Sequence, residues 1–236
     1  MSAIAGRAFE PPACVLFDLD GTLVDTAPDL TAALNQLRAE RALPPLPVAA
    51  IRLTVSQGSP GMLKAGFGLL PDDPSYPELN QRFLQGYRAA IAVESGLFPG
   101  MAEVLEQLER QSIPWGVVTN KPGWLTEPLL KGLGLWSRSA CVVSGDTLAK
   151  AKPHPEPLLY ACDRLAASPR QSLYVGDAER DIVAGQRAGM RTLVAGFGYL
   201  SPEDRPQEWG ADGMLEQPGD LLAWLDQPGS TPVIDP

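Results

Sequence analysis

Beyond residue 97, short apolar runs alternate with segments in which apolar residues recur at helical spacing. The runs are too short for helices and are bounded by turn residues, so each predicts a buried strand. These strands are expected at 114–119, 141–144, 172–175 and 191–195. The helical patterns occur at 101–108, 124–131, 156–167 and 181–188. This alternation predicts a parallel sheet with helices on both faces.

The first part of the chain has a different pattern. One apolar run, Val15–Phe17, predicts a strand, and residues 26–93 then carry helical patterns without a strand. Thr26 is a candidate N-cap for the first helix. Further along, helices are predicted at 48–55 and 62–67, with a turn at 57–61. We therefore expect an α/β core formed by residues 1–25 and 94–236, with loose tails at 1–12 and 227–236, and an all-helical insert at 26–93.

Two acidic residues, Asp18 and Asp20, follow the first predicted strand directly. Side chains two residues apart on an extended chain lie on the same side of it. The carboxyl end of a parallel strand is where open α/β sheets place ligands. Carboxylates this close repel each other unless they share a proton or bind a cation. Because hard oxygen ligands suit Mg²⁺, the pair indicates a magnesium site or a shared proton.

Other polar residues stand at later strand ends. Thr119 and Asn120 close the strand at 114–119, and a hydroxyl and an amide there, followed by helix-start amides, can hold phosphate oxygens. Lys152 precedes a helix and offers a compact positive charge. Asp177 and Asp181 follow the strand at 172–175. Taken singly, Thr119 and Asp177 could simply cap helices, and Lys152 could be a solvated surface lysine.

Composition narrows the possible partners. A hydrophobic share of 44% over 236 residues is ordinary for a globular chain of one domain, or of one domain with an insertion. The net charge of −9 argues against nucleic acid or an anionic membrane surface as partner. A phosphate site in this chain must therefore confine positive charge to a small region.

Three cysteines without a paired spacing argue against a disulfide framework or a zinc site, and a single histidine, His154, excludes multi-histidine metal sites. His154 stands between two prolines, so a structural role is favoured over a catalytic one. Residues 1–12 lack the apolar segment of a signal peptide, and no run has the length of a membrane span. These features are typical of a cytoplasmic protein.

The acidic segment is specific enough to suggest a family. Residues 18–22, Asp-Leu-Asp-Gly-Thr, resemble the DxDGT signature of the haloacid dehalogenase superfamily of phosphohydrolases. Thr119, Lys152 and the Gly-Asp-Ala-Glu-Arg-Asp stretch at 176–181 resemble its second, third and fourth motifs, in the same chain order. The resemblance extends from about Ala13 to Trp224. It implies a Rossmann-like, doubly wound core with a helical type-1 cap inserted after the first strand.

The resemblance also implies roles. Asp18 would be the nucleophile that forms an aspartyl-phosphate, and Asp20 would act as general acid and then general base. Mg²⁺ would be held by Asp18, by the backbone carbonyl of Asp20 and by Asp177. Phosphate oxygens would be bound by Thr119, Asn120, Lys152 and the backbone amides of Leu19 and Asp20. Asp181 would orient Lys152 or metal-bound water.

The helical cap would exclude water and recognise the leaving group of a small phosphorylated metabolite. Gln57, Gly58, Ser59 and Lys64 lie on or beside a cap loop and are candidate substrate contacts; the alternative is a plain surface turn with Lys64 in solvent. The expected oligomeric state is a monomer or a homodimer.

Within the superfamily, the chain resembles bacterial phosphoglycolate phosphatases and, more closely, their paralogues that hydrolyse N-acetylmuramic acid 6-phosphate in cell-wall recycling. The resemblance rests on the segments at 115–122 and 198–204, with 209–212 after them, which belong to the core and not to the cap that would select the substrate. Phosphomutases of the β-phosphoglucomutase type are an alternative, but they carry a cap-hinge histidine that the residues around Asp29 lack. A non-catalytic scaffold is disfavoured because every expected catalytic residue is present.

Overall fold

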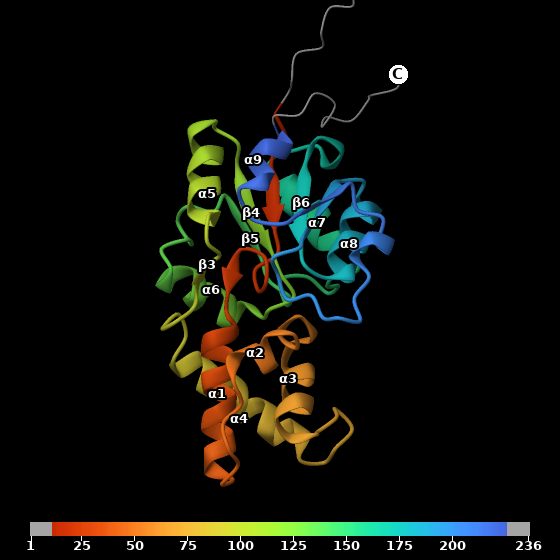
Figure 1. Cartoon of the computed structure of the whole chain (residues 1–236). Coiled ribbons are helices and arrows are strands. Elements are labelled where there is room, and N and C mark those ends of the chain that lie inside the picture. The colour runs from red at the N-terminus through yellow and green to blue at the C-terminus, as the bar shows by residue number, and fades with distance from the viewer. Residues whose placement is uncertain (1–10, 226–236) are drawn as a thin grey trace, which may run out of the picture.

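The computed structural model describes residues 11–225, and its centre is a parallel sheet of six strands (Figure 1). The strands lie in the order β5-β4-β1-β6-β7-β8, and every neighbouring pair is parallel. Their bounds are β1 Val15–Phe17, β4 Trp115–Val118, β5 Cys141–Val143, β6 Leu173–Gly176, β7 Arg191–Ala195 and β8 Gly213–Leu215. The α/β class and the parallel sheet that the sequence predicts are therefore confirmed.

Helices cover both faces of this sheet because alternate residues of its strands point to opposite sides. Val15 and Phe17 of β1 belong to one core cluster, whereas Leu16 belongs to a second one. The first cluster includes residues of α5, α6 and α9, and the second includes residues of α7 and α8. The bounds are α5 Met101–Arg110, α6 Gly123–Gly132, α7 Glu156–Arg164, α8 Glu179–Ala188 and α9 Asp220–Leu225. Two short 3₁₀ helices, η2 Pro169–Gln171 and η3 Pro206–Glu208, lie in the connections.

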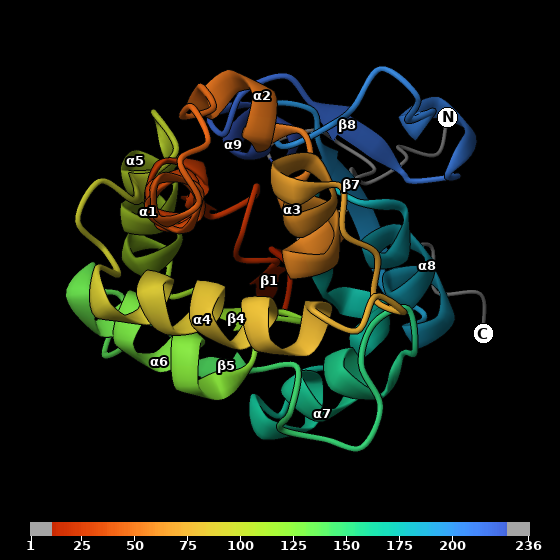
Figure 2. The same ribbon diagram turned by 90° about the horizontal axis from the view of Figure 1, so that it is seen from below.

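A second layer, made of helices only, lies beyond one end of the sheet (Figures 1 and 2). It consists of α1 Ala27–Glu40, α2 Val48–Arg52, the 3₁₀ helix η1 Val55–Gln57, α3 Gly58–Phe67 and α4 Tyr76–Ala89. We call these elements the helical layer. The apolar residues that recur at helical spacing are the buried ones, for example Leu30 and Leu34 in α1 and Phe83 in α4. This burial is what packs the layer into one unit.

Two very short strands, β2 Val24–Asp25 and β3 Gly96–Leu97, join the helical layer to the sheet. They pair antiparallel, so the chain enters and leaves the layer at neighbouring positions. The sequence does not predict this pairing. Strand β8 and helix α9 were not predicted either.

Some element bounds differ from the predicted ones. The predicted helix at 48–55 is split into α2 and η1, and the turn predicted at 57–61 is mostly helical because α3 begins at Gly58. Pro60 is tolerated there since the first N–H groups of a helix have no acceptor within the helix. Thr26 stands at the N-cap position of α1, but its side chain makes no capping hydrogen bond. The predicted loose tails fall almost entirely outside the described residues.

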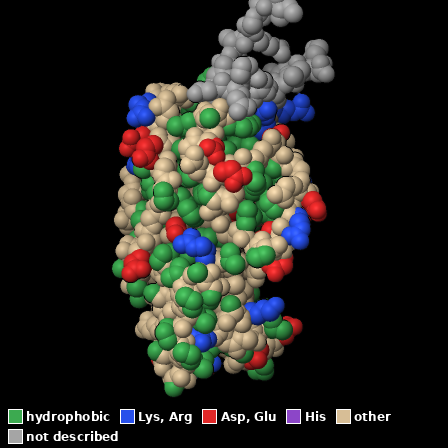
Figure 3. Space-filling view, in the orientation of Figure 1, with side chains coloured by type: hydrophobic (Ala, Val, Ile, Leu, Met, Phe, Trp, Pro, Cys, Tyr) green, Lys and Arg blue, Asp and Glu red, His purple; other side chains and the backbone are tan. Residues whose placement is uncertain are grey.

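Three observations on the described residues concern membranes, surface charge and cysteines. No helix between residues 11 and 225 combines the length and the apolarity needed to cross a bilayer. On the face seen in Figure 3, acidic and basic side chains are interspersed. The three cysteines are free thiols, as their spacing predicts.

Candidate active site

The carboxyl ends of β1, β4 and β6 face the helical layer, and a cavity of about 430 Å³ lies between the two. Its floor includes Asp18, Asp20 and Thr119, which stand at strand ends. Its walls are largely apolar and come mainly from the helical layer, with Met62 and Phe83 among them. A polar floor under apolar walls is typical of a small-molecule site.

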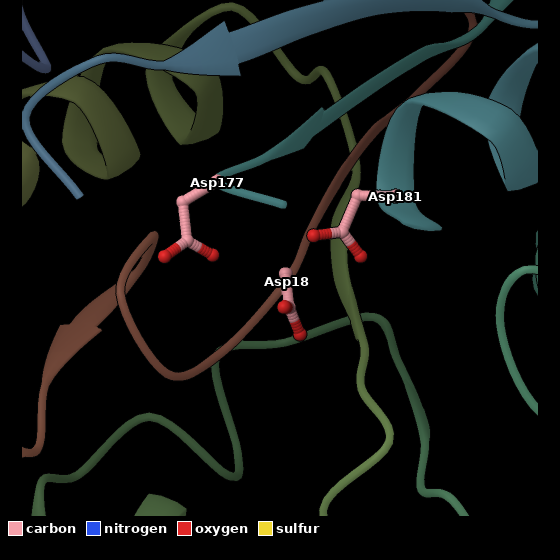
Figure 4. A group of neighbouring side chains, drawn as sticks. All are labelled: Asp18, Asp177 and Asp181. Carbon is pink, nitrogen blue, oxygen red and sulfur yellow. The ribbon is translucent and has the colours of Figure 1, made fainter. Parts of the chain in front are cut away.

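Three buried carboxylates form the centre of the floor. One oxygen from each of Asp18, Asp177 and Asp181 can be chosen so that all lie within 4.8 Å of one another. Figure 4 shows the three side chains converging from the end of β1, the end of β6 and the first turn of α8. The predicted neighbourhood of Asp18 and Asp177 is therefore present. Asp181, predicted as an orienting residue, contributes its carboxylate to the same cluster.

The glycine of the acidic motif is required by this arrangement. Gly21 has a φ of +85°, a conformation that L side chains rarely adopt. A Cβ atom on Gly21 would lie 2.2 Å from Oδ2 of Asp177. The turn after Asp20 can therefore approach Asp177 only because residue 21 has no side chain.

Without a metal ion, the negative charges of the cluster repel one another. Burial, followed by the charges of Asp18 and Asp181, raises the pKa of Asp177 to about 7. Burial also raises the pKa of Asp181. A hard divalent cation would offset this repulsion, and carboxylate oxygens are the ligands that Mg²⁺ prefers. The donor set therefore fits Mg²⁺.

Lys152 is buried behind the nucleophile candidate. Its Nζ lies 2.9 Å from Oδ1 of Asp18 and 2.7 Å from Oδ1 of Asp181, and it also donates to the carbonyl of Val118 and the hydroxyl of Tyr174. Burial opposes ionisation of Asp18, but the charges of Lys152 and Arg180 outweigh it and lower the pKa of Asp18. Lys152 thus keeps Asp18 anionic, although it is not among the residues that line the cavity.

The two carboxylate oxygens of Asp18 have different surroundings. Oδ1 accepts a hydrogen bond from the backbone amide of Leu19 at 2.7 Å in addition to its contact with Lys152. Oδ2 makes no hydrogen bond within residues 11–225 and lies 4.0 Å from Nη2 of Arg180. Oδ2 is therefore the oxygen that is free to attack. The Leu19 amide, which was predicted to bind phosphate, donates its hydrogen bond to Asp18 in this structure.

Asp20 points away from the carboxylate cluster and toward the helical layer. Its Oδ1 accepts hydrogen bonds from Oγ1 of Thr26 at 2.6 Å and from Nζ of Lys121 at 2.9 Å. The Lys121 ammonium also lies 4.5 Å from the ring centroid of Tyr87, which belongs to α4. The Asp20 side chain is thus not part of the carboxylate cluster. Lys121 and Tyr87 were not predicted as site residues.

Thr119 and Asn120 occupy the end of β4, as predicted, but with different surroundings. Oγ1 of Thr119 accepts a hydrogen bond from the amide of Lys121 at 3.1 Å, which leaves its proton available to a ligand. Asn120 uses both ends of its amide on the backbone of Lys152, at 2.9 Å and 3.0 Å. The Asn120 side chain therefore positions Lys152, and Asn120 also lines the cavity; its predicted contact with phosphate stays a prediction.

The residues proposed from the cap loop separate into two groups. Gln57, Gly58 and Ser59 line the cavity. Lys64 is exposed on α3 and is not among the lining residues. Ser56, which was not predicted, makes the direct connection to the floor, because its Oγ donates to Oδ2 of Asp177 at 2.8 Å.

Tyr199 links the carboxylate cluster to the start of the helical layer. Its amide donates to Oδ2 of Asp177 at 3.0 Å. Its hydroxyl accepts hydrogen bonds from the amides of Thr26 and Ala27, at 2.7 Å and 3.0 Å, and donates to Oδ1 of Asp25 at 2.8 Å. Tyr199 therefore caps α1 in place of the Thr26 side chain. Tyr199 was not predicted as a site residue. The family resemblance of the segment at 198–204 was the only signal in the sequence that could have pointed to it.

His154 stands apart from the cavity. Its Nδ1 accepts a hydrogen bond from the amide of Glu156 at 3.2 Å, next to the start of α7, and Nε2 lies 3.3 Å from Nζ of Lys150. It is not among the residues that line the cavity. These contacts fit the structural role that the flanking prolines indicated.

The fold and the site together define a class. A parallel sheet with aspartates after its central strand, a buried lysine and a second acidic pair one strand away, all under a helical layer, is the arrangement of a haloacid dehalogenase-type phosphohydrolase. The chain belongs to this family, since residues 15–195 match the family model described as haloacid dehalogenase-like hydrolase.

Curated relatives extend the match over nearly the whole chain. The chain is 44% identical to the N-acetylmuramic acid 6-phosphate phosphatase of Pseudomonas aeruginosa, over 90% of this chain and 94% of that protein. It is 45% identical to a phosphoglycolate phosphatase of Xanthomonas campestris, over 90% and 97% of the two chains. The family and these relatives establish the chain as a phosphoric monoester hydrolase.

Solved structures agree on the fold. A predicted phosphoglycolate phosphatase from Haemophilus somnus is similar with a TM-score of 0.79 and 26% identity, covering 92% of this chain and 99% of that one. A putative β-phosphoglucomutase from Thermotoga maritima is similar with a TM-score of 0.70 and 24% identity, covering 90% and 97%. The second likeness concerns the fold alone.

Proposed function

We propose that the protein hydrolyses a small-molecule phosphomonoester in a Mg²⁺-dependent reaction through an aspartyl-phosphate on Asp18. The observation that carries the proposal is the asymmetry of the Asp18 carboxylate. Asp18 lines the cavity, and Lys152 and the Leu19 amide occupy its Oδ1, whereas Oδ2 makes no hydrogen bond within residues 11–225. An ionised carboxylate with one free oxygen is equipped for nucleophilic attack.

The metal site supports this chemistry. Asp18, Asp177 and the backbone carbonyl of Asp20 would hold Mg²⁺, with the Asp181 carboxylate beside them. When bound, the ion would neutralise the charge that otherwise keeps an anionic carboxylate and an anionic phosphate apart. Lys152 and Asn120 keep the nucleophile side of the site in place from behind.

Asp20 lines the cavity and would transfer the protons of the reaction. It would donate a proton to the leaving alcohol in the first step and accept one from water in the second. Thr26 and Lys121 fix the position of its carboxyl group. The Thr119 hydroxyl would donate to a phosphoryl oxygen as charge develops there.

We further propose that the helical layer, residues 26–93, acts as a cap over the core formed by residues 1–25 and 94–236. Its support is the cavity between the two and the direct contact of Ser56 with Asp177. A cap in this position excludes water and surrounds the leaving group.

For the substrate we propose a phosphorylated acid, N-acetylmuramic acid 6-phosphate before 2-phosphoglycolate. Both compounds are named as substrates of relatives of similar identity. A cavity of about 430 Å³ with largely apolar walls lies within the usual range of about 300–1,000 Å³ for drug-sized ligands and is generous for a two-carbon acid. Size thus favours the larger sugar acid.

The decisive experiment is phosphate release from a panel that contains both acids, N-acetylglucosamine 6-phosphate and other phosphorylated metabolites, with Mg²⁺ and with a chelator. We expect turnover of N-acetylmuramic acid 6-phosphate that the chelator abolishes. Preference for neither acid would remove the substrate proposal. Undiminished turnover in the presence of the chelator would contradict the proposed dependence on Mg²⁺.

A phosphomutase of the β-phosphoglucomutase type is the second candidate, and the structural likeness to such a protein concerns the fold alone. The chain's single histidine lies before α7 and outside the cavity, so no histidine of the helical layer can shuttle protons. Interconversion of sugar phosphates without phosphate release would establish this alternative.

A further inference from the structure

Arg180 stands at the reacting centre, beside the nucleophile candidate. It belongs to the first turn of α8, between Asp177 and Asp181, and it lines the cavity. Its Nη2 lies 4.0 Å from Oδ2 of Asp18, the oxygen that is free to attack. Lys152, in contrast, contacts Oδ1 from behind. The two cations thus approach different oxygens of the same carboxylate.

The guanidinium group is only partly satisfied. Nη1 donates to the carbonyl of Ser56 at 2.6 Å, which fixes one edge of the planar group. Nε is buried and has no hydrogen-bond partner within residues 11–225. The 4.0 Å separation from Asp18 is too long for a hydrogen bond. Nη2, which makes no hydrogen bond within residues 11–225, is therefore the donor that remains for an oxygen atom of a ligand in the cavity.

Geometry identifies the ligand oxygen. A phosphorus atom poised for attack lies about 3–3.5 Å from the nucleophilic oxygen. Its equatorial oxygens then extend sideways from the line of attack, toward a donor that stands 4.0 Å from Oδ2 of Asp18. The forked donors of arginine match phosphate oxygens well.

We infer that Arg180 is a further catalytic residue, which binds an equatorial phosphoryl oxygen with one edge of its guanidinium while the other edge holds Ser56 of the helical layer. This inference rests on the proposed function. As the bond between Oδ2 of Asp18 and phosphorus forms and the bond to the leaving oxygen breaks, Asp20 supplies the proton to that oxygen. Arg180 donates hydrogen bonds throughout and transfers no proton.

The double contact gives the helical layer a part in the reaction. Ser56 positions Arg180 through its carbonyl and contacts Asp177 through its hydroxyl. Arg180 therefore has its reactive orientation when the helical layer lies against the sheet. Full stabilisation of the phosphoryl group then requires this closed arrangement.

The test compares R180A and R180K with R187A in the presence of Mg²⁺. Arg187 lies on the same helix, is exposed, and makes one hydrogen bond within residues 11–225, to the carbonyl of Pro153, so R187A matches the charge change. We expect R180A to lower kcat by about 100- to 1,000-fold, as loss of one transition-state donor does. R187A should change kcat less than about twofold, and R180K should recover about tenfold over R180A.

Two further readouts separate a catalytic from a structural role. Vanadate, which adopts a five-coordinate geometry like the transferring phosphoryl group, should inhibit R180A at least about tenfold more weakly than wild type. Free guanidinium ion should restore part of the R180A rate, whereas NaCl at equal ionic strength should not. Thermal unfolding of each variant, with R180K as the milder change, reports on folding.

The inference is overturned if R180A keeps kcat and vanadate inhibition within threefold of wild type, or if only KM rises. A wild-type protein that releases phosphate from no compound in the panel would overturn the proposed function first, and the role of Arg180 with it. Activity in wild type together with an unaffected R180A would overturn the inference alone.

Discussion

At the scale of single residues, three chemically identical carboxyl groups of the site have pKa values that are shifted in different directions. Asp18, Asp177 and Asp181 form one buried cluster, but the surroundings lower the pKa of the first and raise the pKa of the other two. Lys152 contacts Asp18 and Asp181 and does not contact Asp177. Lys152 therefore favours the ionised form of Asp18, whereas Asp177, which Lys152 does not contact, is the carboxylate whose ionisation a bound metal ion would favour.

Asp18→Asn should abolish turnover and leave the fold intact. The amide keeps the size of the carboxylate but is not a nucleophile at neutral pH. We expect phosphate release to fall by about 10³-fold or more, with an unchanged far-ultraviolet circular dichroism spectrum. Asp72→Asn, in an exposed loop, is the matched control. Substantial residual activity in the Asp18 variant would remove this residue from its role.

Asp177→Asn should change the pH dependence of stability. The folded pKa of about 7 lies above the usual value of 3.8, so the folded state binds more protons between these values. The stability contributed by this group therefore falls as pH rises from about 4 to about 7 and is constant above. Without metal, the variant should unfold several degrees higher than wild type at pH 8, with a smaller difference near pH 5.

Wild type and the Asp177→Asn variant also test whether Asp177 binds Mg²⁺. Mg²⁺ should raise the unfolding temperature of wild type at pH 8, because binding to the folded state stabilises it. The neutral amide in Asp177→Asn lacks the negative charge of the carboxylate, so this variant should show little of the shift. An equal shift in both proteins would show that Asp177 does not hold the ion.

At the scale of elements, the two connections between sheet and helical layer are fastened to each other. Asp29, buried in α1, accepts hydrogen bonds from the amides of Val93, Glu94 and Ser95 and from the Ser95 hydroxyl, at 2.6–3.0 Å. The carboxylate therefore ties the segment that leaves the layer to the helix that enters it. Charged acceptors of this kind make strong hydrogen bonds.

Asp29→Ala should lower the free energy of unfolding by on the order of 2–4 kcal/mol, since three backbone amides lose their acceptor. Urea unfolding measures this change, and Asp72→Ala, which removes an exposed carboxylate, should change stability by less than about 0.5 kcal/mol. Equal stability of the two variants would mean that the connections are held by other contacts.

The sequence predicts the elements of the core better than those at its margins. Apolar runs such as Val15–Phe17 and motifs that directly follow strands are local signals, and they place Asp18 and Asp177 correctly. Strand β8 has three residues and an exposed Met214, so it lacks an apolar run. The contacts of Lys121 with Tyr87 and of Arg180 with Ser56 join segments far apart in the chain. No local pattern predicts such contacts.

At the scale of the whole molecule, the cavity between the two layers is the space that a leaving group would occupy in the proposed reaction. Leu84 of α4 lines this cavity from the helical layer, far along the chain from every motif of the core. Its position shows why core segments that resemble particular phosphatases do not settle the substrate. In the proposed reaction, the choice of substrate depends on the volume that the sheet and the helical layer enclose together.

Leu84→Trp should narrow the cavity and discriminate by size. We expect kcat/KM for N-acetylmuramic acid 6-phosphate to fall about tenfold or more, whereas that for 2-phosphoglycolate should stay within about threefold. Leu70→Trp, at an exposed loop position, is the matched control. Equal losses for both substrates would mean that the wall at Leu84 does not contact the leaving group.

The antiparallel pairing of β2 with β3 has a consequence for how this enzyme type diversifies. Since Val24 and Leu97 are neighbours, everything between them is a cassette whose two ends meet at one place on the scaffold. Recombination that exchanged such a cassette would leave the six-stranded register untouched, but it would replace Thr26 and Ser56, which contact Asp20, Asp177 and Arg180. An exchanged segment can therefore bring a new specificity in one genetic step only when it supplies equivalent contacts in the places of Thr26 and Ser56.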